Sequence, residues 1–151
     1  TGRANIGAVA LNLPMIWQKS EGKNFYNDLD HYMQMIRDFH KKRYDVLANT
    51  PCSSNPMAFC QGGLYKGNKT ETDLIGYDIV KSFTASFGVT SLNELNVLME
   101  GKPLHESDRK MVNEVVDFIL DRIDAYKKED CESFEADVMT SPPKFSVFVV
   151  N

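Results

Sequence analysis

The residue best placed to do chemistry is Cys60, which stands in the segment NPMAFCQGG at residues 55–63. Gly62 and Gly63 allow a tight turn and a close approach of a ligand to the backbone. No acidic or basic side chain lies within five positions of Cys60, whereas an activated thiolate normally needs a neighbouring cation, histidine or helix N-terminus. The pattern therefore suits a neutral thiol that exchanges hydrogen atoms in a dry enclosure. A buried structural cysteine is the alternative interpretation.

The other metal-ligating side chains are few and dispersed. The chain has three cysteines and three histidines: Cys52, Cys60, Cys131, His31, His40 and His105. They show none of the paired spacings of a structural zinc site, so no metal is expected. An odd cysteine count also argues against an extracellular disulfide framework and favours the reducing cytoplasm. Cys52 is interpreted as a loop or structural thiol, and Cys131 receives no function.

Cys60 lies in a long irregular segment, residues 49–70, in which prolines and glycines exclude a long regular element. Met57, Phe59 and Tyr65 are too apolar for a solvated linker. A long loop with apolar anchors inside a compact chain is usually functional.

Alternating helices and strands must position this loop. Apolar runs at residues 5–13, 83–89 and 145–150 predict strands, the first buried on both faces. Apolar spacings of three and four residues predict helices at 25–47, 71–82, 91–99 and 107–128, two of them opened by capping boxes at Thr70-x-x-Asp73 and Ser91-x-x-Glu94. This order predicts an α/β fold. The basic cluster at residues 41–43 suits the end of a helix dipole or a contact with a nucleotide phosphate.

Composition excludes several classes of protein. With 17 basic and 21 acidic side chains the formal charge is -4, which disfavours nucleic-acid binding. No apolar run approaches the ~20 residues of a membrane span, and no secretory signal is present. Because the chain starts without methionine and enters a strand at once, it is expected to be a piece of a longer polypeptide.

Three separated blocks of the sequence resemble the anaerobic, class III ribonucleotide reductases. They are GRANIGAVALNLP at residues 2–14, NPMAFCQGG at 55–63 and TASFGVTSLNELNVLMEG at 84–101. The resemblance covers roughly residues 1–130 and is strongest around Cys60. It implies a glycyl-radical enzyme built as a ten-stranded α/β barrel with long flanking helices and a finger loop. This chain would be a partial barrel of that type.

The resemblance also implies roles for particular residues. Cys60 would carry the transient thiyl radical that takes the 3′ hydrogen of the ribose. Gln61, Gly62 and Gly63 would shape the substrate cavity, and Ser86 would face it from a barrel strand. The family's asparagine near the reacting ribose is not transferred, because residues 81–89 contain none.

In the family, an iron–sulfur activase uses S-adenosylmethionine to make the glycyl radical, and formate or a dithiol supplies electrons. The partners implied are ribonucleoside triphosphates, the remaining reductase polypeptide, the activase and a second copy in the complete homodimer. Neither the radical-glycine loop nor the zinc module is recognisable in these 151 residues, so no cofactor is expected to bind the fragment itself. The expected division is a catalytic-barrel fragment at 1–130 and a divergent tail at 131–151.

The leading hypothesis is thus a fragment of an anaerobic ribonucleoside-triphosphate reductase, inactive alone. A non-catalytic remnant that acts as a binding or assembly module is the main alternative. A different glycyl-radical lyase is a weaker one, because the block around Cys60 looks reductase-like.

Overall fold

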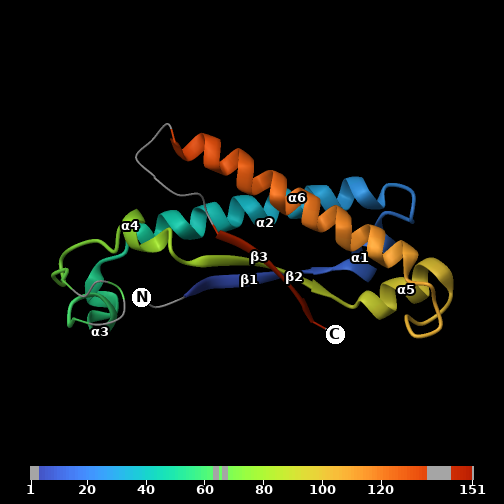
Figure 1. Ribbon diagram of the computed structural model, residues 1–151, viewed down its shortest axis with the longest axis horizontal. Helices are drawn as coiled ribbons and strands as arrows, with labels where there is room; N and C mark the ends of the chain where they lie inside the picture. The colour runs from blue at the N-terminus through green and yellow to red at the C-terminus, as the bar shows by residue number, and fades with distance from the viewer. Residues whose placement is uncertain (1–3, 63–64, 66–67, 136–143, 151) are drawn as a thin grey trace. The chain divides into compact units, whose positions relative to one another are not determined.

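The computed structural model describes residues 4–62, 65, 68–135 and 144–150. Figure 1 shows the elements in chain order. They are β1 (Asn5–Asn12), α1 (Leu13–Lys19), α2 (Phe25–Ala48), the 3-10 helix η1 (Cys52–Ser54), α3 (Pro56–Phe59), α4 (Tyr77–Val80), β2 (Thr84–Thr90), α5 (Leu92–Glu100), α6 (Lys110–Glu135) and β3 (Lys144–Val150). The α/β class predicted from the sequence is therefore confirmed. None of the described helices combines the length and the apolar content that a bilayer crossing requires.

The three strands form one sheet in the order β1-β2-β3. β1 and β2 are parallel: the Thr84 amide donates to the Ala4 carbonyl (2.9 Å), and Thr90 Oγ1 donates to the Leu11 carbonyl (3.0 Å). The central strand is buried at residues 85–89, whereas β1, at the edge, exposes alternate residues. Burial of β1 on both faces was therefore a wrong prediction. The described sheet has three strands, so a barrel of ten strands stays a prediction.

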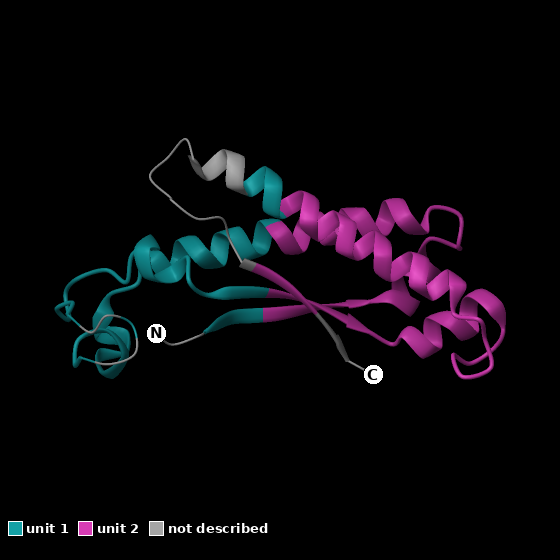
Figure 2. Cartoon of the chain, viewed as in Figure 1, with its two compact units in different colours: residues 1–7, 38–85, 127–144 teal, residues 8–37, 86–126, 145–151 magenta. Residues whose placement is uncertain are grey.

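The chain divides into two compact units, coloured separately in Figure 2. One unit holds residues 1–7, 38–85 and 127–144, and the other holds residues 8–37, 86–126 and 145–151. The boundary cuts through strands and through the long helices α2 and α6, so each unit contains part of the sheet and part of these helices. Cys60 and its loop belong entirely to the first unit.

The core of the second unit is aromatic. Phe87 of β2 is 0% exposed, and its ring lies 5.7 Å from Phe145 of β3, edge to face, and 6.4 Å from Tyr126 of α6. The Arg37 guanidinium lies over the Tyr126 ring, 4.6 Å from its centroid. The helices α2 and α6 also meet through Asp30 and Arg122, which form an ion pair. The strand and the two helices therefore share one core.

In the first unit, α2 packs on the start of β2. The buried Tyr44 donates its hydroxyl to the carbonyl of Phe83, the residue before β2, at 2.8 Å. Lys41 forms an ion pair with the buried carboxylate of Asp130 at 3.0 Å, which joins α2 to the end of α6 in this unit. These two contacts fix the last turns of α2 beside the start of β2 and the end of α6.

Several local predictions were wrong. The helix predicted at 71–82 is reduced to α4, because Thr70 and Asp73 close a turn on each other and Gly76 adopts a φ of +80°. Ser91 does not cap α5 with its side chain, since its backbone is left-handed. The sequence reasoning also missed α1, whose start is capped by the Asn12 side chain.

Candidate functional site

The loop predicted at residues 49–70 is irregular but ordered by short turns. Asn55 caps α3 by accepting a hydrogen bond from the Ala58 amide, and Pro56 occupies the first turn, where its missing N–H costs nothing. The Cys60 amide then donates to the Pro56 carbonyl at 2.8 Å, which ends α3 at this cysteine. Two successive turns, η1 and α3, therefore separate Cys52 at the start of the first from Cys60 at the end of the second.

The start of the loop is held by backbone pairing with the segment before α4. The Cys52 amide donates to the Asp73 carbonyl at 2.8 Å, and the Ser53 amide donates to the Glu71 carbonyl at 3.0 Å. Further along, Tyr77 donates its hydroxyl to Asp45 of α2 at 2.6 Å, which raises the pKa of Tyr77 to about 12. These bonds fix the base of the loop to α2 and α4.

Aromatic side chains place the loop at the amino end of β2. The Tyr65 ring stacks on Phe59 at 5.7 Å and meets Phe83 edge to face at 5.0 Å. Since Phe83 immediately precedes β2, the loop lies where this strand begins.

The Cys60 thiol is neutral and half-buried. Burial raises its pKa, and Cys52, Glu71 and Asp73 raise the pKa further by electrostatic repulsion of the thiolate. A smaller hydrogen-bonding contribution from the Cys52 side chain raises the pKa of Cys60 in the same direction. Both cysteines are free. The environment therefore keeps the S–H bond that hydrogen-atom transfer requires and disfavours nucleophilic attack.

The other residues predicted to form the site lie in different environments. Gln61 is exposed, and Gly62, also exposed, adopts a φ of +68° with open space where a Cβ would stand. Gly63 lies outside the described residues. Ser86 belongs to the second unit, where it is 3% exposed and its hydroxyl lies 2.8 Å from that of Ser146. Ser86 is thus hydrogen-bonded to β3.

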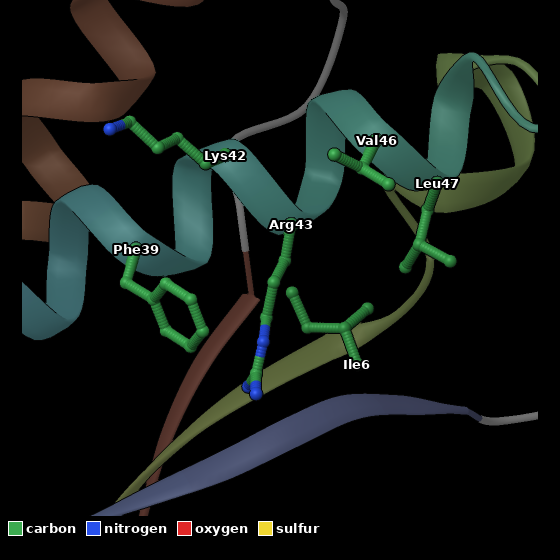
Figure 3. A pocket seen from close by; sticks show the side chains of 6 residues that line it. All are labelled: Ile6, Phe39, Lys42, Arg43, Val46 and Leu47. Atoms are coloured by element: carbon green, nitrogen blue, oxygen red, sulfur yellow. The ribbon is translucent and has the colours of Figure 1, made fainter.

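A separate pocket of about 300 Å³ opens in the first unit between α2 and β1, as Figure 3 shows. It is lined by Ile6, Phe39, Lys42, Arg43, Val46 and Leu47. The lining is largely apolar, with two cationic side chains from the basic cluster of α2. Cys60 is not among the lining residues, so the pocket and the thiol are two separate features of this unit.

Gly7 is the residue that lets Arg43 enter this pocket. The Arg43 guanidinium lies over the Phe39 ring at 4.3 Å, and its Nη1 is buried without a hydrogen-bond partner among the described residues. A Cβ on Gly7 would stand 2.6 Å from this Nη1, and Gly7 has a φ of +120°. A glycine inside a strand often marks a close approach of another group, and this signal was present in the sequence.

Gly7→Ala is therefore expected to destabilise the chain by roughly 1–3 kcal/mol, because alanine is strained at this φ and displaces Arg43. Gly101→Ala is the matched control: Gly101 also has a positive φ, but nothing lies within 4 Å of its Cβ position. Urea unfolding of both variants and of Gly7→Ala/Arg43→Ala measures the effect. Equal losses for Gly7→Ala with and without Arg43 would show that the guanidinium contact contributes nothing.

The basic cluster at residues 41–43 has divided roles. Lys41 pairs with Asp130, whereas the exposed Lys42 and the half-buried Arg43 line the pocket. Across the described part of the chain, no group of three or more cysteine, histidine or acidic side chains could hold a metal ion.

The family model for anaerobic ribonucleoside-triphosphate reductase matches residues 1–142, which extends past the boundary predicted at residue 130. The curated proteins give no significant match. The family match spans both units and nearly the whole sequence, including the Cys60 loop. The chain therefore belongs to the anaerobic ribonucleoside-triphosphate reductase family.

Proposed function

We propose that this chain supplies part of the catalytic polypeptide of an anaerobic ribonucleoside-triphosphate reductase, with Cys60 as its hydrogen-atom carrier. The family match over residues 1–142 is the observation that carries the proposal. The neutral, half-buried thiol of Cys60 supports the assignment of the reacting residue. We further propose that the chain is inactive without the rest of the polypeptide.

In the proposed step, the sulfur of Cys60, as a thiyl radical, takes the 3′ hydrogen atom of the ribose and becomes a thiol. The 2′ hydroxyl then accepts a proton and leaves as water, and formate or a dithiol supplies two electrons. The thiol returns its hydrogen atom to C3′, so the cysteine ends the cycle as it began. The radical-generating activase supplies only the first oxidation. A group that stays uncharged throughout suits surroundings that oppose a thiolate.

The other candidate site residues would position the substrate and would not react with it. The exposed side chain of Gln61 could contact a ligand directly. Gly62 leaves open space at the turn, because no atom lies near the position of a Cβ. Gly63 would act with them. Ser86 is the weaker candidate for a substrate contact, since its hydroxyl is already hydrogen-bonded to Ser146.

A second candidate function is a non-catalytic assembly module. The observation that favours it is the position of β1 at the edge of the sheet, with alternate side chains exposed. An edge strand presents backbone donors and acceptors to which another segment can pair. Under this alternative the chain binds the remaining polypeptide and contributes no reacting group.

The test is an anaerobic assay of the assembled enzyme that contains this chain, with activase, S-adenosylmethionine, formate and ribonucleoside triphosphates. The proposal predicts deoxyribonucleotide that disappears when the activase is omitted. A stable assembly that binds nucleotide yet forms no deoxyribonucleotide with the activase present would favour the assembly module.

A further inference from the structure

The pocket between α2 and β1 combines apolar walls with one inward-reaching cation. Four of its lining side chains are apolar: Ile6, Phe39, Val46 and Leu47. The Arg43 side chain extends from α2 toward β1, between Phe39 and Ile6, as Figure 3 shows. Every lining residue belongs to the first unit, so the pocket lies within one compact body. Its volume of about 300 Å³ is at the lower end of the range for small-molecule sites.

The Arg43 guanidinium has donor capacity that the described part of the chain does not use. It lies over the Phe39 ring, 4.3 Å from the centroid, and an aromatic ring does not replace a conventional hydrogen-bond acceptor. Its Nη1 is buried and has no hydrogen-bond partner among the described residues. Gly7 leaves the room for this nitrogen, because a Cβ there would stand 2.6 Å from it. A buried donor without an acceptor is unfavourable, so an acceptor brought by a ligand stabilises this arrangement.

We propose that this pocket binds a small carboxylic acid with an apolar body, whose carboxylate accepts hydrogen bonds from Arg43. A planar carboxylate matches the fork of N–H groups that a guanidinium presents. The apolar body would cover Phe39 and Val46, which are 45% and 68% exposed in the empty pocket. A phosphate dianion would need further donors to replace its water, and the four apolar side chains supply none.

The second cation of the lining, Lys42, has a different position. Lys42 is exposed, and its ammonium group points away from the Arg43 guanidinium in Figure 3. It can therefore attract an anion only through solvent, where salt screens the interaction. Recognition of the carboxylate is thus assigned to Arg43, and Lys42 provides a matched control of the same charge. The inference concerns a pocket that does not include Cys60, so it does not depend on nucleotide reduction.

The test is a titration of the ¹⁵N-labelled chain with octanoate, followed by amide chemical shifts in NMR spectra. The shifts are expected at Ile6, Phe39 and Leu47, which line the pocket. Octanamide has the same length without the charge and should bind at least about tenfold more weakly, because it cannot form a charge-assisted hydrogen bond. Acetate has the carboxylate without the apolar body and should also bind at least about tenfold more weakly.

Two variants separate a specific contact from general attraction. Arg43→Met keeps an apolar stem and should weaken octanoate binding at least about tenfold, which removes the preference over octanamide. Lys42→Met removes the same charge and should weaken octanoate binding less than about threefold. Far-UV circular dichroism checks that each variant is folded.

Equal binding of octanoate and octanamide by the wild-type chain would overturn the proposal, whether or not Arg43→Met folds. So would equal losses of octanoate affinity in Arg43→Met and Lys42→Met. Shifts spread over both units, without a set confined to the pocket, would show that octanoate acts only as a surfactant and would also overturn the proposal.

Discussion

The isolated 151-residue chain is expected to form no deoxyribonucleotide, although it contains the proposed reacting cysteine. Cys60 can carry a radical only if another group generates it, and no radical-glycine loop is recognisable in this sequence. The three described strands also leave β1 at an open edge, so they do not enclose a cavity that excludes water. We therefore expect both requirements for radical chemistry to come from the rest of the polypeptide.

The measurement is an anaerobic incubation of the chain with activase, S-adenosylmethionine, reductant, formate and ribonucleoside triphosphates. A parallel reaction adds the remaining reductase polypeptide and serves as the positive control. Product from the chain alone would contradict the view that it is one part of a larger catalytic unit. Product that appears only on addition of the second polypeptide would support it.

The largest effect on stability is expected for Phe87→Ala. Phe87 is 0% exposed and contacts the rings of Phe145 and Tyr126, so its removal leaves a cavity in the centre of the second unit. Truncation of a buried phenylalanine typically costs about 3–5 kcal/mol. Leu120→Ala is the matched control, because Leu120 is an apolar residue of the same unit that is 43% exposed.

Urea unfolding monitored by circular dichroism gives both values. We expect Leu120→Ala to cost less than about 1 kcal/mol, as substitutions at exposed positions usually do. Equal losses for Phe87→Ala and Leu120→Ala would show that the ring cluster is not the core of this unit.

The long elements could be predicted from the sequence because their apolar spacing is unambiguous. The helix predicted at 25–47 corresponds to α2. The helix predicted at 107–128 corresponds to α6, which starts three residues later and extends to Glu135. The strands at 5–13, 83–89 and 145–150 correspond to β1, β2 and β3 within a residue or two. In each case many residues contribute to one periodic signal, so no single exception changes the result.

Short elements were harder to predict because one residue decides each of them. The strand predicted at 5–13 stops before Pro14, yet a proline shortly after a capping asparagine is equally typical of the first turn of a helix. The Thr70 and Asp73 pair fits a capping box in sequence but closes a turn in the structure. Local composition allows both outcomes, and the surrounding packing selects one.

The features of the candidate site divide in the same way. The absence of basic neighbours in the sequence around Cys60 agrees with its raised pKa, whereas the acidic Glu71 and Asp73 that raise the pKa further lie beyond the loop in sequence. The positions of Cys52 at the start of η1 and of Cys60 at the end of α3 depend on two consecutive turns, which no spacing rule predicts. The approach of Arg43 to Gly7 joins residues far apart in the chain, so only the fold reveals it.

The central claim is that Cys60 carries the hydrogen atom, and Cys60→Ser in the assembled enzyme tests it most directly. The serine O–H bond is much stronger than S–H, so serine cannot give and take a hydrogen atom usefully, while its similar size limits packing losses. With Cys131→Ser as the matched control, deoxyribonucleotide formation is expected to vanish only in Cys60→Ser, and nucleotide binding should persist in both variants. Substantial nucleotide reduction by Cys60→Ser under anaerobic conditions would contradict the account.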